Sequence, residues 1–323
     1  MAVQQYVYFQ GGFVPAEDAK VSVLNHAFNY GTGCFEGIRG YATAEASDVL
    51  LFRLREHMTR LHQSSHIIGC DVKLTVDELC DLALEVVRRN EQHGDVYIRP
   101  LVYKCGTGIG VTMAGVPDDV TIFSVPFGKY IETEKGIRCS ISSWRRSSDN
   151  NIPPRAKITG GYINAALAKH EALANGFDEA IMLTDDGSVS EGSAENLFIV
   201  RNGVLYSPAV SDSVLEGITR ATVSTLAEAE LGIRTVERKI SRTELYTADE
   251  VFLCGTGAEI SPVIEVDRRK IGAGVVGPIT SRLQTVYFSA VRGEQPAYAS
   301  WVTSVYKSAA VPPSVVASPA RVG

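Results

Sequence analysis

The spacing of apolar and polar residues predicts both strands and helices in the first half of the chain. Short runs rich in β-branched and aromatic residues, at Tyr6–Phe9 and Val49–Phe52, are typical of strands. Over residues 55–68 the apolar side chains recur at helical spacing, which predicts a helix. Thr75 and Glu78 then stand three positions apart, so we expect a capping box that begins a second helix.

The middle and second half of the chain mix the same two kinds of pattern. Residues 96–103, 120–125 and 137–143 are rich in β-branched and aromatic residues, and we expect them to be strands of a mixed sheet. Helical patterns follow at residues 161–175 and 217–231, each ended by a glycine. Strands separate and follow these helices, so the sequence predicts an α+β protein with two lobes.

The expected domains follow from where composition changes along the chain. We expect one domain over residues 1–127 and a second over residues 137–307. Residues 128–136 are polar and bracketed by glycines, so they are the expected interdomain connection. Residues 308–323 are rich in Ala, Val, Pro and Ser with little charge, which predicts a disordered tail.

Composition excludes several classes of partner. The net charge is −6 and the Lys and Arg residues are scattered, so the chain has no basic field for nucleic acid. The N-terminal segment lacks the pattern of a signal peptide, and no apolar run approaches bilayer length. We therefore expect a cytoplasmic protein without a membrane partner. The six cysteines stand singly, with no CxxC pair and no zinc-ligand spacing, which predicts reduced thiols and no metal site.

Lys157 is the first candidate for chemistry. It follows the Pro153-Pro154 pair and precedes Gly160-Gly161, where a helix is expected, so a stiff segment would hold it in place. Tyr162 lies five residues further on. An arbitrary lysine is far more often a solvated surface residue, and this alternative stays open for Lys157 taken alone.

Glu191 is the second candidate, because it stands beside Gly192 in a turn-rich segment. Glycine lets backbone approach a ligand closely. A buried glutamate would need a positive partner or hydrogen bond, such as a protonated ring nitrogen, to stay charged. The alternative is a plain hairpin turn at Asp186-Gly187 that leaves Glu191 facing solvent.

Two turns rich in glycine and threonine could receive a phosphate. Gly217-Ile218-Thr219 precedes a helical pattern, and the free N–H groups and dipole of a helix start attract anions. Thr256 lies between Gly255 and Gly257 after an expected strand, where backbone amides and a hydroxyl are available. A purely structural helix cap or strand end is the alternative for each turn.

Together these motifs resemble the class IV, or fold-type IV, pyridoxal-phosphate-dependent aminotransferases, and within them the branched-chain amino acid aminotransferases. The resemblance runs nearly end to end, and the motifs keep their order along the chain. The matching residues are Asn25-His26-Ala27, Tyr30-Gly31, Phe35-Glu36-Gly37-Ile38-Arg39, Arg55-Glu56-His57-Met58, Arg60-Leu61, Tyr97-Ile98-Arg99-Pro100, Ala156-Lys157, Ser190-Glu191-Gly192, Glu195-Asn196-Leu197-Phe198, Gly217-Ile218-Thr219-Arg220 and Gly255-Thr256.

The resemblance implies an α+β, two-domain fold like that of D-amino acid aminotransferase. It has a small α/β N-terminal domain and a larger C-terminal domain with mixed and antiparallel sheets, and its cofactor is pyridoxal 5'-phosphate. Lys157 would be the Schiff-base lysine and general base, Tyr162 would contact the phenolic oxygen, and Glu191 would pair with the pyridine nitrogen. A carboxylate there keeps the nitrogen protonated, which makes the ring an electron sink. The residues implied to hold the phosphate are Arg60, Ile218, Thr219 and Thr256.

Substrate contacts are also implied by the resemblance. Side chains around an apolar pocket would be Phe35, Tyr97, Phe127 and Tyr130, although ordinary core packing is the alternative for Phe35 and Phe127. The Thr256-Gly257-Ala258 turn and Arg99 would lie near the substrate α-carboxylate, and Gly37 would also line the site. Gly257 stands where many branched-chain enzymes carry alanine, and Phe127 where some carry tryptophan. Both changes enlarge or loosen the site, so a substrate range that includes some (R)-amines is a further hypothesis.

The resulting hypothesis is transamination of L-leucine, L-isoleucine and L-valine with 2-oxoglutarate, giving branched 2-oxo acids and L-glutamate. The resemblance implies a homodimer or higher homo-oligomer, with each site closed partly by the neighbouring small domain. Three alternatives stay open: an (R)-amine or D-amino acid aminotransferase of the same fold, an aminodeoxychorismate lyase, and a non-catalytic cofactor-binding protein. Residues 30–39 and Tyr97-Ile98-Arg99 favour the L-branched-chain hypothesis.

Overall fold

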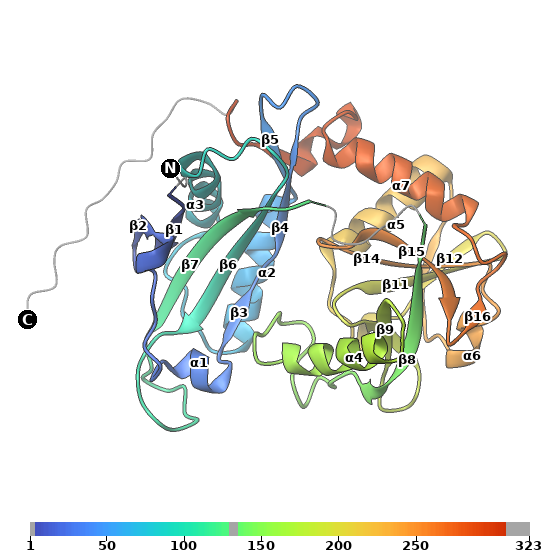
Figure 1. The fold of residues 1–323 in the computed structure, drawn as a ribbon, viewed down its shortest axis with the longest axis horizontal. Coiled ribbons are helices and arrows are strands. Elements are labelled where there is room, and N and C mark those ends of the chain that lie inside the picture. Colours follow the sequence, from blue (N-terminus) through green and yellow to red (C-terminus); the bar gives the residue numbers. More distant parts are fainter. Residues whose placement is uncertain (1–3, 129–134, 308–323) are drawn as a thin grey trace, which may run out of the picture.

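Two β-sheets, each with its own helices, make up the computed structural model, which describes residues 4–128 and 135–307 (Figure 1). The first sheet has the strand order β17-β5-β4-β6-β7-β1-β2, with β3 paired to β6, and all of these pairs are antiparallel. Its strands are β1 (Tyr6–Phe9), β2 (Gly12–Pro15), β3 (Gly33–Phe35), β4 (Ile38–Ala42), β5 (Val49–Phe52), β6 (Val96–Lys104), β7 (Asp118–Pro126) and β17 (Val302–Ser304).

Helices from the first part of the chain cover this sheet. Apolar side chains of α2 and α3 form one core with the sheet, centred on fully buried residues such as Met58, Leu61 and Ile98. Burying apolar surface between helix and sheet is the main force that holds this lobe together. The elements are η1 (Ala16–Asp18), α1 (His26–Tyr30), α2 (Leu54–Ile67) and α3 (Val76–Arg89).

The second sheet is mixed and follows the order β10-β9-β8-β15-β14-β11-β12-β13, with β16 paired to β15. The parallel pairs are β8 with β9, β8 with β15, and β12 with β13. Its strands are β8 (Ile137–Arg145), β9 (Glu179–Leu183), β10 (Val189–Gly192), β11 (Asn196–Arg201), β12 (Val204–Ser207), β13 (Thr235–Glu237), β14 (Glu250–Gly255), β15 (Glu259–Val266) and β16 (Arg269–Lys270).

Helices of the second lobe pack on both sides of this sheet (Figure 1). Helices α5 and α7 share an apolar core with β11 and β14, where Phe198 and Phe252 stack with their ring centroids 5.1 Å apart. The elements are α4 (Tyr162–Ala174), η2 (Val210–Asp212), α5 (Ile218–Leu231), α6 (Arg242–Leu245), α7 (Pro278–Val291) and η3 (Pro296–Trp301).

Local signals in the sequence correctly predict several element boundaries. The capping box at α3 is confirmed: Thr75 Oγ1 accepts from the Glu78 backbone N–H at 3.2 Å, and the Thr75 N–H donates to the Glu78 carboxylate at 2.7 Å. Helix α5 ends at Gly232, whose φ of 66° is a left-handed conformation that favours glycine. The predicted helices at residues 55–68 and 161–175 correspond to α2 and α4.

Strand pairing differs from the sequence expectation at two places. The three segments at 96–103, 120–125 and 137–143 are strands, but the expectation of one mixed sheet is wrong, because β6 and β7 pair in the antiparallel sheet whereas β8 joins the other. The chain also returns to the first sheet near its end, where β17 pairs with β5. Strand propensity does not specify a partner, since side-chain packing decides the pairing.

The expected domain limits therefore stay a prediction. Most of the connection expected at residues 128–136 and all of the expected tail at residues 308–323 lie outside the described residues. Residues 302–304, expected in the large domain, belong to the first sheet, where the Asp48 carboxylate accepts from Ser304 Oγ at 2.5 Å and from the Tyr306 N–H at 2.9 Å. The C-terminal end of the segment that forms the second lobe is thus bonded to the first lobe.

Two features of the described residues bear on partners. No helix within 4–128 or 135–307 has the length and apolar character needed to cross a membrane. The same residues contain no group of three or more His, Cys, Asp or Glu side chains placed to hold a metal ion. All six cysteines are free thiols, and four of them are buried.

Glu250 generates a stability prediction, because its carboxylate caps the start of α7. It accepts from the N–H groups of Ile279 and Thr280 at 2.9 and 2.7 Å and from Thr280 Oγ1 at 2.6 Å. Glu250→Gln should lower the free energy of unfolding by roughly 1–3 kcal/mol, since a charged acceptor at a helix N-terminus is lost. Urea unfolding measures this, with Glu228→Gln on the exposed face of α5 as a control that should change little.

Candidate active site

One cavity of about 480 Å³ gathers the predicted site residues from both lobes. Its walls come from the first sheet, α2, the start of α4, the β10–β11 segment, the start of α5 and the β14–β15 turn. The predicted residues that line it are Phe35, Gly37, Arg60, Tyr97, Arg99, Phe127, Lys157, Tyr162, Glu191, Ile218, Thr219, Thr256, Gly257 and Ala258. Tyr130 lies outside the described residues. The predicted residues are thus brought together, while their roles stay predictions.

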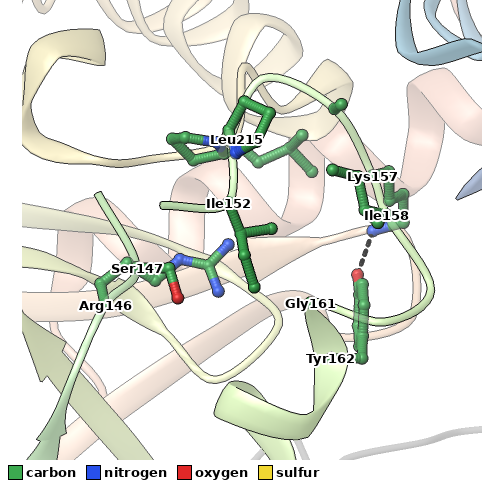
Figure 2. Close-up of a pocket in the computed structure, with 11 residues that line it drawn as sticks. Arg146, Ser147, Ile152, Lys157, Ile158, Gly161, Tyr162 and Leu215 are labelled. Carbon is green, nitrogen blue, oxygen red and sulfur yellow. Dashed lines mark hydrogen bonds between the residues drawn. The ribbon is translucent and has the colours of Figure 1, made fainter. Parts of the chain in front are cut away.

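Lys157 points at Tyr162 inside this cavity. Its Nζ donates to Tyr162 Oη at 2.6 Å, as Figure 2 shows, and lies 5.2 Å from the centre of the Phe35 ring. A smaller void of about 30 Å³ adjoins the pair and is lined by the stiff Pro153-Pro154 segment and by Ile152 (Figure 2). Lys157 is half-buried and paired, so the alternative of a solvated surface lysine is wrong.

The backbone around Lys157 is fastened to the first lobe. The Phe35 N–H donates to the Lys157 carbonyl at 3.0 Å, the Lys157 N–H donates to Ser64 Oγ at 3.2 Å, and the Thr159 N–H donates to the Gly33 carbonyl at 2.9 Å. These bonds leave side-chain rotation as the main freedom of the lysine, because its main chain cannot shift without breaking them.

Glycines allow this close approach of the two lobes. A Cβ on Gly31 would lie 2.6 Å from the Cα of Gly160, closer than real Cβ contacts occur. Gly31 also has a φ of 67°, which favours glycine. The pair therefore determines how near the Lys157 segment comes to β3.

Glu191 is a buried carboxylate that has three partners among the described residues. Arg146 lies 2.7 Å from Oε1, while Oε2 accepts from Asn196 Nδ2 at 2.9 Å and from the Leu215 N–H at 3.1 Å. Burial raises the pKa of Glu191 although the Arg146 charge opposes this. A carboxylate has about four acceptor positions, so one stays available for a donor in the cavity. The hairpin turn near Gly187 exists, but the alternative that Glu191 faces solvent is wrong.

The start of α5 also borders the cavity, close to Leu215 and Asn196, which bond to Glu191. Within the described residues no side chain accepts from the first N–H groups of α5, and Ile218 and Thr219 line the cavity. Free N–H groups at a helix start favour anions. A Cβ on Gly217 would lie 1.8 Å from Asn196 Oδ1, which explains why a glycine precedes the helix. Arg60 reaches the same place, because its Nη1 donates to the Glu216 carbonyl at 2.8 Å.

Aromatic side chains and arginines form the third wall. The rings of Tyr97 and Phe127 are 5.1 Å apart, and Arg99 Nη2 donates to Tyr97 Oη at 2.7 Å while its guanidinium lies 4.2 Å from the Phe35 ring centre. Gly37 faces the same hydroxyl, and a Cβ there would be only 2.1 Å from it. Phe35 and Phe127 thus line the cavity, which is more than ordinary core packing requires.

The sequence did not show what Arg39 contacts. Its Nη1 donates to the Gly257 carbonyl at 3.2 Å, its Nη2 donates to the Gly128 carbonyl at 2.9 Å, and it pairs with the Glu259 carboxylate at 3.4 Å. Arg39 therefore connects two segments: the backbone at Gly128, at the end of the first lobe, and the β14–β15 turn that contains Gly257.

Several cavity residues were not predicted as part of the site. Arg146, Asn196, Glu195 and Lys169 all line the cavity. Glu195 is buried, and this burial together with the nearby Glu179 raises its pKa to about 8. Glu195 and Asn196 stand in a motif that matches the family, which was the available signal, whereas no motif marked Arg146 or Lys169.

Comparison with known proteins gives the family. Residues 33–266 match the amino-transferase class IV family. The chain belongs to the class IV aminotransferases. A curated relative of this class IV chain, the branched-chain-amino-acid aminotransferase of Escherichia coli K12, is 43% identical, and the match covers 93% of this chain and 97% of the relative.

Solved structures are similar to this class IV aminotransferase over nearly its whole length. The Thermoproteus uzoniensis branched-chain aminotransferase with norvaline is 46% identical with a TM-score of 0.90, covering 94% of this chain and 100% of that one. The T.th. branched-chain amino acid aminotransferase complexed with N-(5'-phosphopyridoxyl)-L-glutamate is 43% identical with a TM-score of 0.89, covering 94% and 99%. The expected family and α+β fold are confirmed.

The raised pKa of Glu195 generates a pH prediction. The pKa of Glu195 is about 8 in the folded chain, whereas its ordinary value is 4.5. Between pH 4.5 and about 8 the folded chain therefore holds a proton on Glu195 that the unfolded chain has released. Stability that depends on this proton is present below about pH 4.5 and is lost as the pH rises through about 8. Glu195→Gln, which is neutral throughout, should therefore become steadily more stable than the unmodified chain across this window. Urea unfolding at several pH values checks it; parallel curves would show that Glu195 titrates normally.

Proposed function

We propose that the protein is a branched-chain amino acid aminotransferase, which transfers the amino group of L-leucine, L-isoleucine or L-valine to 2-oxoglutarate with pyridoxal 5'-phosphate as cofactor. One observation carries this proposal: a single cavity holds the Lys157–Tyr162 pair, the buried Glu191 and the uncapped start of α5. The near full-length likeness to proteins of that name supports it.

The residues present fit this cofactor at each end. Glu191 has one acceptor position left for a protonated ring nitrogen, and its raised pKa would be lowered by a positive charge placed there. The free N–H groups of α5, Arg60 and Thr256 would hold the phosphate. When bound, pyridoxal 5'-phosphate supplies a carbonyl that condenses with amines and a ring that withdraws electrons from the substrate α-carbon.

Lys157 would move the proton. A lysine amine at this position can take a proton from the substrate α-carbon and return it to another carbon within its reach. Tyr162 Oη accepts a hydrogen bond from Lys157 Nζ at 2.6 Å and so holds the amine in place. The fastened backbone keeps the range of Nζ small, which favours the reactive orientation.

The walls of the cavity support an amino acid with an apolar side chain. Phe35, Tyr97 and Phe127 offer aromatic surface that is stabilised by burying aliphatic groups. Arg99 and the turn at Gly257 and Ala258 would bind the α-carboxylate. Solved relatives carry norvaline or a phosphopyridoxyl-L-glutamate, so related sites accept both side-chain classes.

We also propose a cytoplasmic homodimer. Six free thiols fit a reducing compartment. Val23, Phe28, Ile109 and Val111 are apolar side chains that are each more than two-thirds exposed. Their segments lie side by side, since the Gly108 N–H donates to the Leu24 carbonyl at 3.2 Å. Apolar surface of this kind marks an interface, and a second copy of the chain is the proposed partner.

Loss of Lys157 should abolish covalent cofactor attachment. With pyridoxal 5'-phosphate the unmodified chain should turn yellow, and borohydride reduction should add the cofactor to the Lys157 peptide, as read by mass spectrometry. Lys157→Ala should show neither result and no turnover, because the amine that attacks the cofactor carbonyl is removed. Lys73→Ala, at an exposed lysine outside the cavity, is the control and should behave like the unmodified chain. Cofactor attached elsewhere would contradict the assignment.

The substrate class is tested by the absorbance spectrum with single substrates. L-Leucine, L-isoleucine or L-valine should convert the yellow form into the pyridoxamine form, and 2-oxoglutarate should reverse this. Conversion by D-alanine or (R)-1-phenylethylamine alone would instead support the D-amino acid or (R)-amine alternative. Release of pyruvate from aminodeoxychorismate without an amino acceptor would identify a lyase, and yellow colour without any turnover would indicate a non-catalytic protein.

A further inference from the structure

We infer that Glu36, fastened by His57, is a positioning residue that aims Arg60 at the cofactor phosphate and joins the phosphate site to the substrate wall. This inference rests on the proposed function, because it concerns the same cavity and the same cofactor. Glu36 itself does not line the cavity, so it would act through its neighbours.

The contacts of Glu36 are those of a holder for a guanidinium group. The side chain is fully buried. Arg60 Nε donates to Oε1 at 2.6 Å, and Arg60 Nη2 donates to Oε2 at 2.9 Å, which is the paired geometry that matches a carboxylate to one edge of an arginine. His57 Nδ1 lies 2.7 Å from Oε2 and fixes the carboxylate from another side.

Some N–H donors of Arg60 remain available for a ligand. A guanidinium has five N–H donors. Glu36 takes two of them and the Glu216 carbonyl takes a third, so within the described residues one N–H on each of Nη1 and Nη2 has no acceptor. Arg60 lines the cavity beside the start of α5. Two free donors on adjacent nitrogens suit two oxygens of one phosphate, provided that the group is held in this rotation.

Charge explains why this holder has to be an anion. Although burial opposes it, the Arg60 charge together with His57 holds the pKa of Glu36 well below its usual range. Burial lowers the pKa of His57, so the ring is neutral and donates Nδ1–H without adding a second cation. Without Glu36, Arg60 would be a largely buried charge with no carboxylate partner, which is strongly unfavourable.

Removing the negative charge of Glu36 has two opposing effects on phosphate. Coulomb attraction between Arg60 and phosphate would strengthen, because a nearby anion is gone. The guanidinium of Arg60 would also lose the paired hydrogen bonds to the Glu36 carboxylate that orient it, and it could then rotate away from the cavity. We expect orientation to prevail, since two of its three existing hydrogen bonds are those to Glu36.

The position of Glu36 in the chain extends its effect to the substrate. Phe35 holds the Lys157 carbonyl through its N–H, and Gly37 lies against Tyr97 Oη. The Glu36 N–H donates to the Pro100 carbonyl at 2.9 Å, which fastens the segment between these two neighbours. A displaced Glu36 would thus shift a catalytic contact and a substrate contact together.

Comparison of pyridoxal 5'-phosphate with pyridoxal, which lacks the phosphate, tests the inference. Binding of each to the cofactor-free protein is followed by absorbance and tryptophan fluorescence. Glu36→Gln should weaken binding of the phosphorylated form by about tenfold or more and leave pyridoxal nearly unchanged, as expected when a group that orients a ligand-binding residue is lost. Glu36→Asp keeps the negative charge, so its affinity for the phosphorylated form should lie between those of the unmodified chain and Glu36→Gln.

Two further variants separate positioning from a general loss of stability. His57→Phe keeps a ring of similar volume but removes the donor to Glu36, so it should reduce the preference for the phosphorylated form by a smaller factor. If Glu36→Gln does not fold, this variant and Glu36→Asp carry the test. Glu250→Gln, a buried carboxylate outside the cavity, is the matched control: it should lower stability without changing the ratio of the two affinities.

The outcomes distinguish this inference from the proposed function. If the unmodified chain binds neither compound, the proposed function fails. If it binds both with a clear preference for the phosphate and Glu36→Gln keeps that preference or increases it, only the inference is overturned. If Glu36→Gln lowered the affinity for both compounds equally, the inference would also be overturned, because Glu36 would then have only a structural role and no specific effect on phosphate binding.

Discussion

The backbone contact between residues 31–35 and the segment around Lys157 is the constraint on which the site depends. Lys157 precedes a helix of the second lobe, yet its main chain bonds to β3 and to Ser64 of the first. Gly31 and Gly160 permit this contact, since a side chain at Gly31 would overlap Gly160. The lysine therefore lies where the lobes meet, and each lobe can supply one wall of the cavity around it.

Buried charged groups around this junction have hydrogen-bonded partners, and each set of partners holds a different part of the cavity wall. Arg146 and Asn196 hold Glu191, Glu36 holds Arg60, and Arg39 ties the Gly257 turn to the first lobe. Every one of these groups would be costly to bury alone, so the pairs form as complete units. The apolar cores of the lobes set the distance between the elements, whereas these pairs set the direction of the polar groups.

Sequence patterns predicted the elements well where the physics is local. Thr75 with Glu78 marked the start of α3, and Gly232 the end of α5, because capping needs only residues a few positions apart. The predicted site residues that the structure describes all line one cavity, while their roles stay predictions. Pairing of β6, β7 and β8 was predicted wrongly, and β17 was not foreseen, because strand partners depend on packing across long sequence separations.

By itself, the sequence determined the family, the two-lobed α+β class and the residue types available for chemistry, because these depend on patterns and motifs read in order along the chain. Only the tertiary structure decided that Glu36 faces Arg60, that Arg146 meets Glu191 and that Arg39 reaches Gly257. Residues 39 and 257 are far apart in the sequence, and their contact follows from how the two lobes pack. Packing of this kind is a property of the whole fold, which local propensity does not encode.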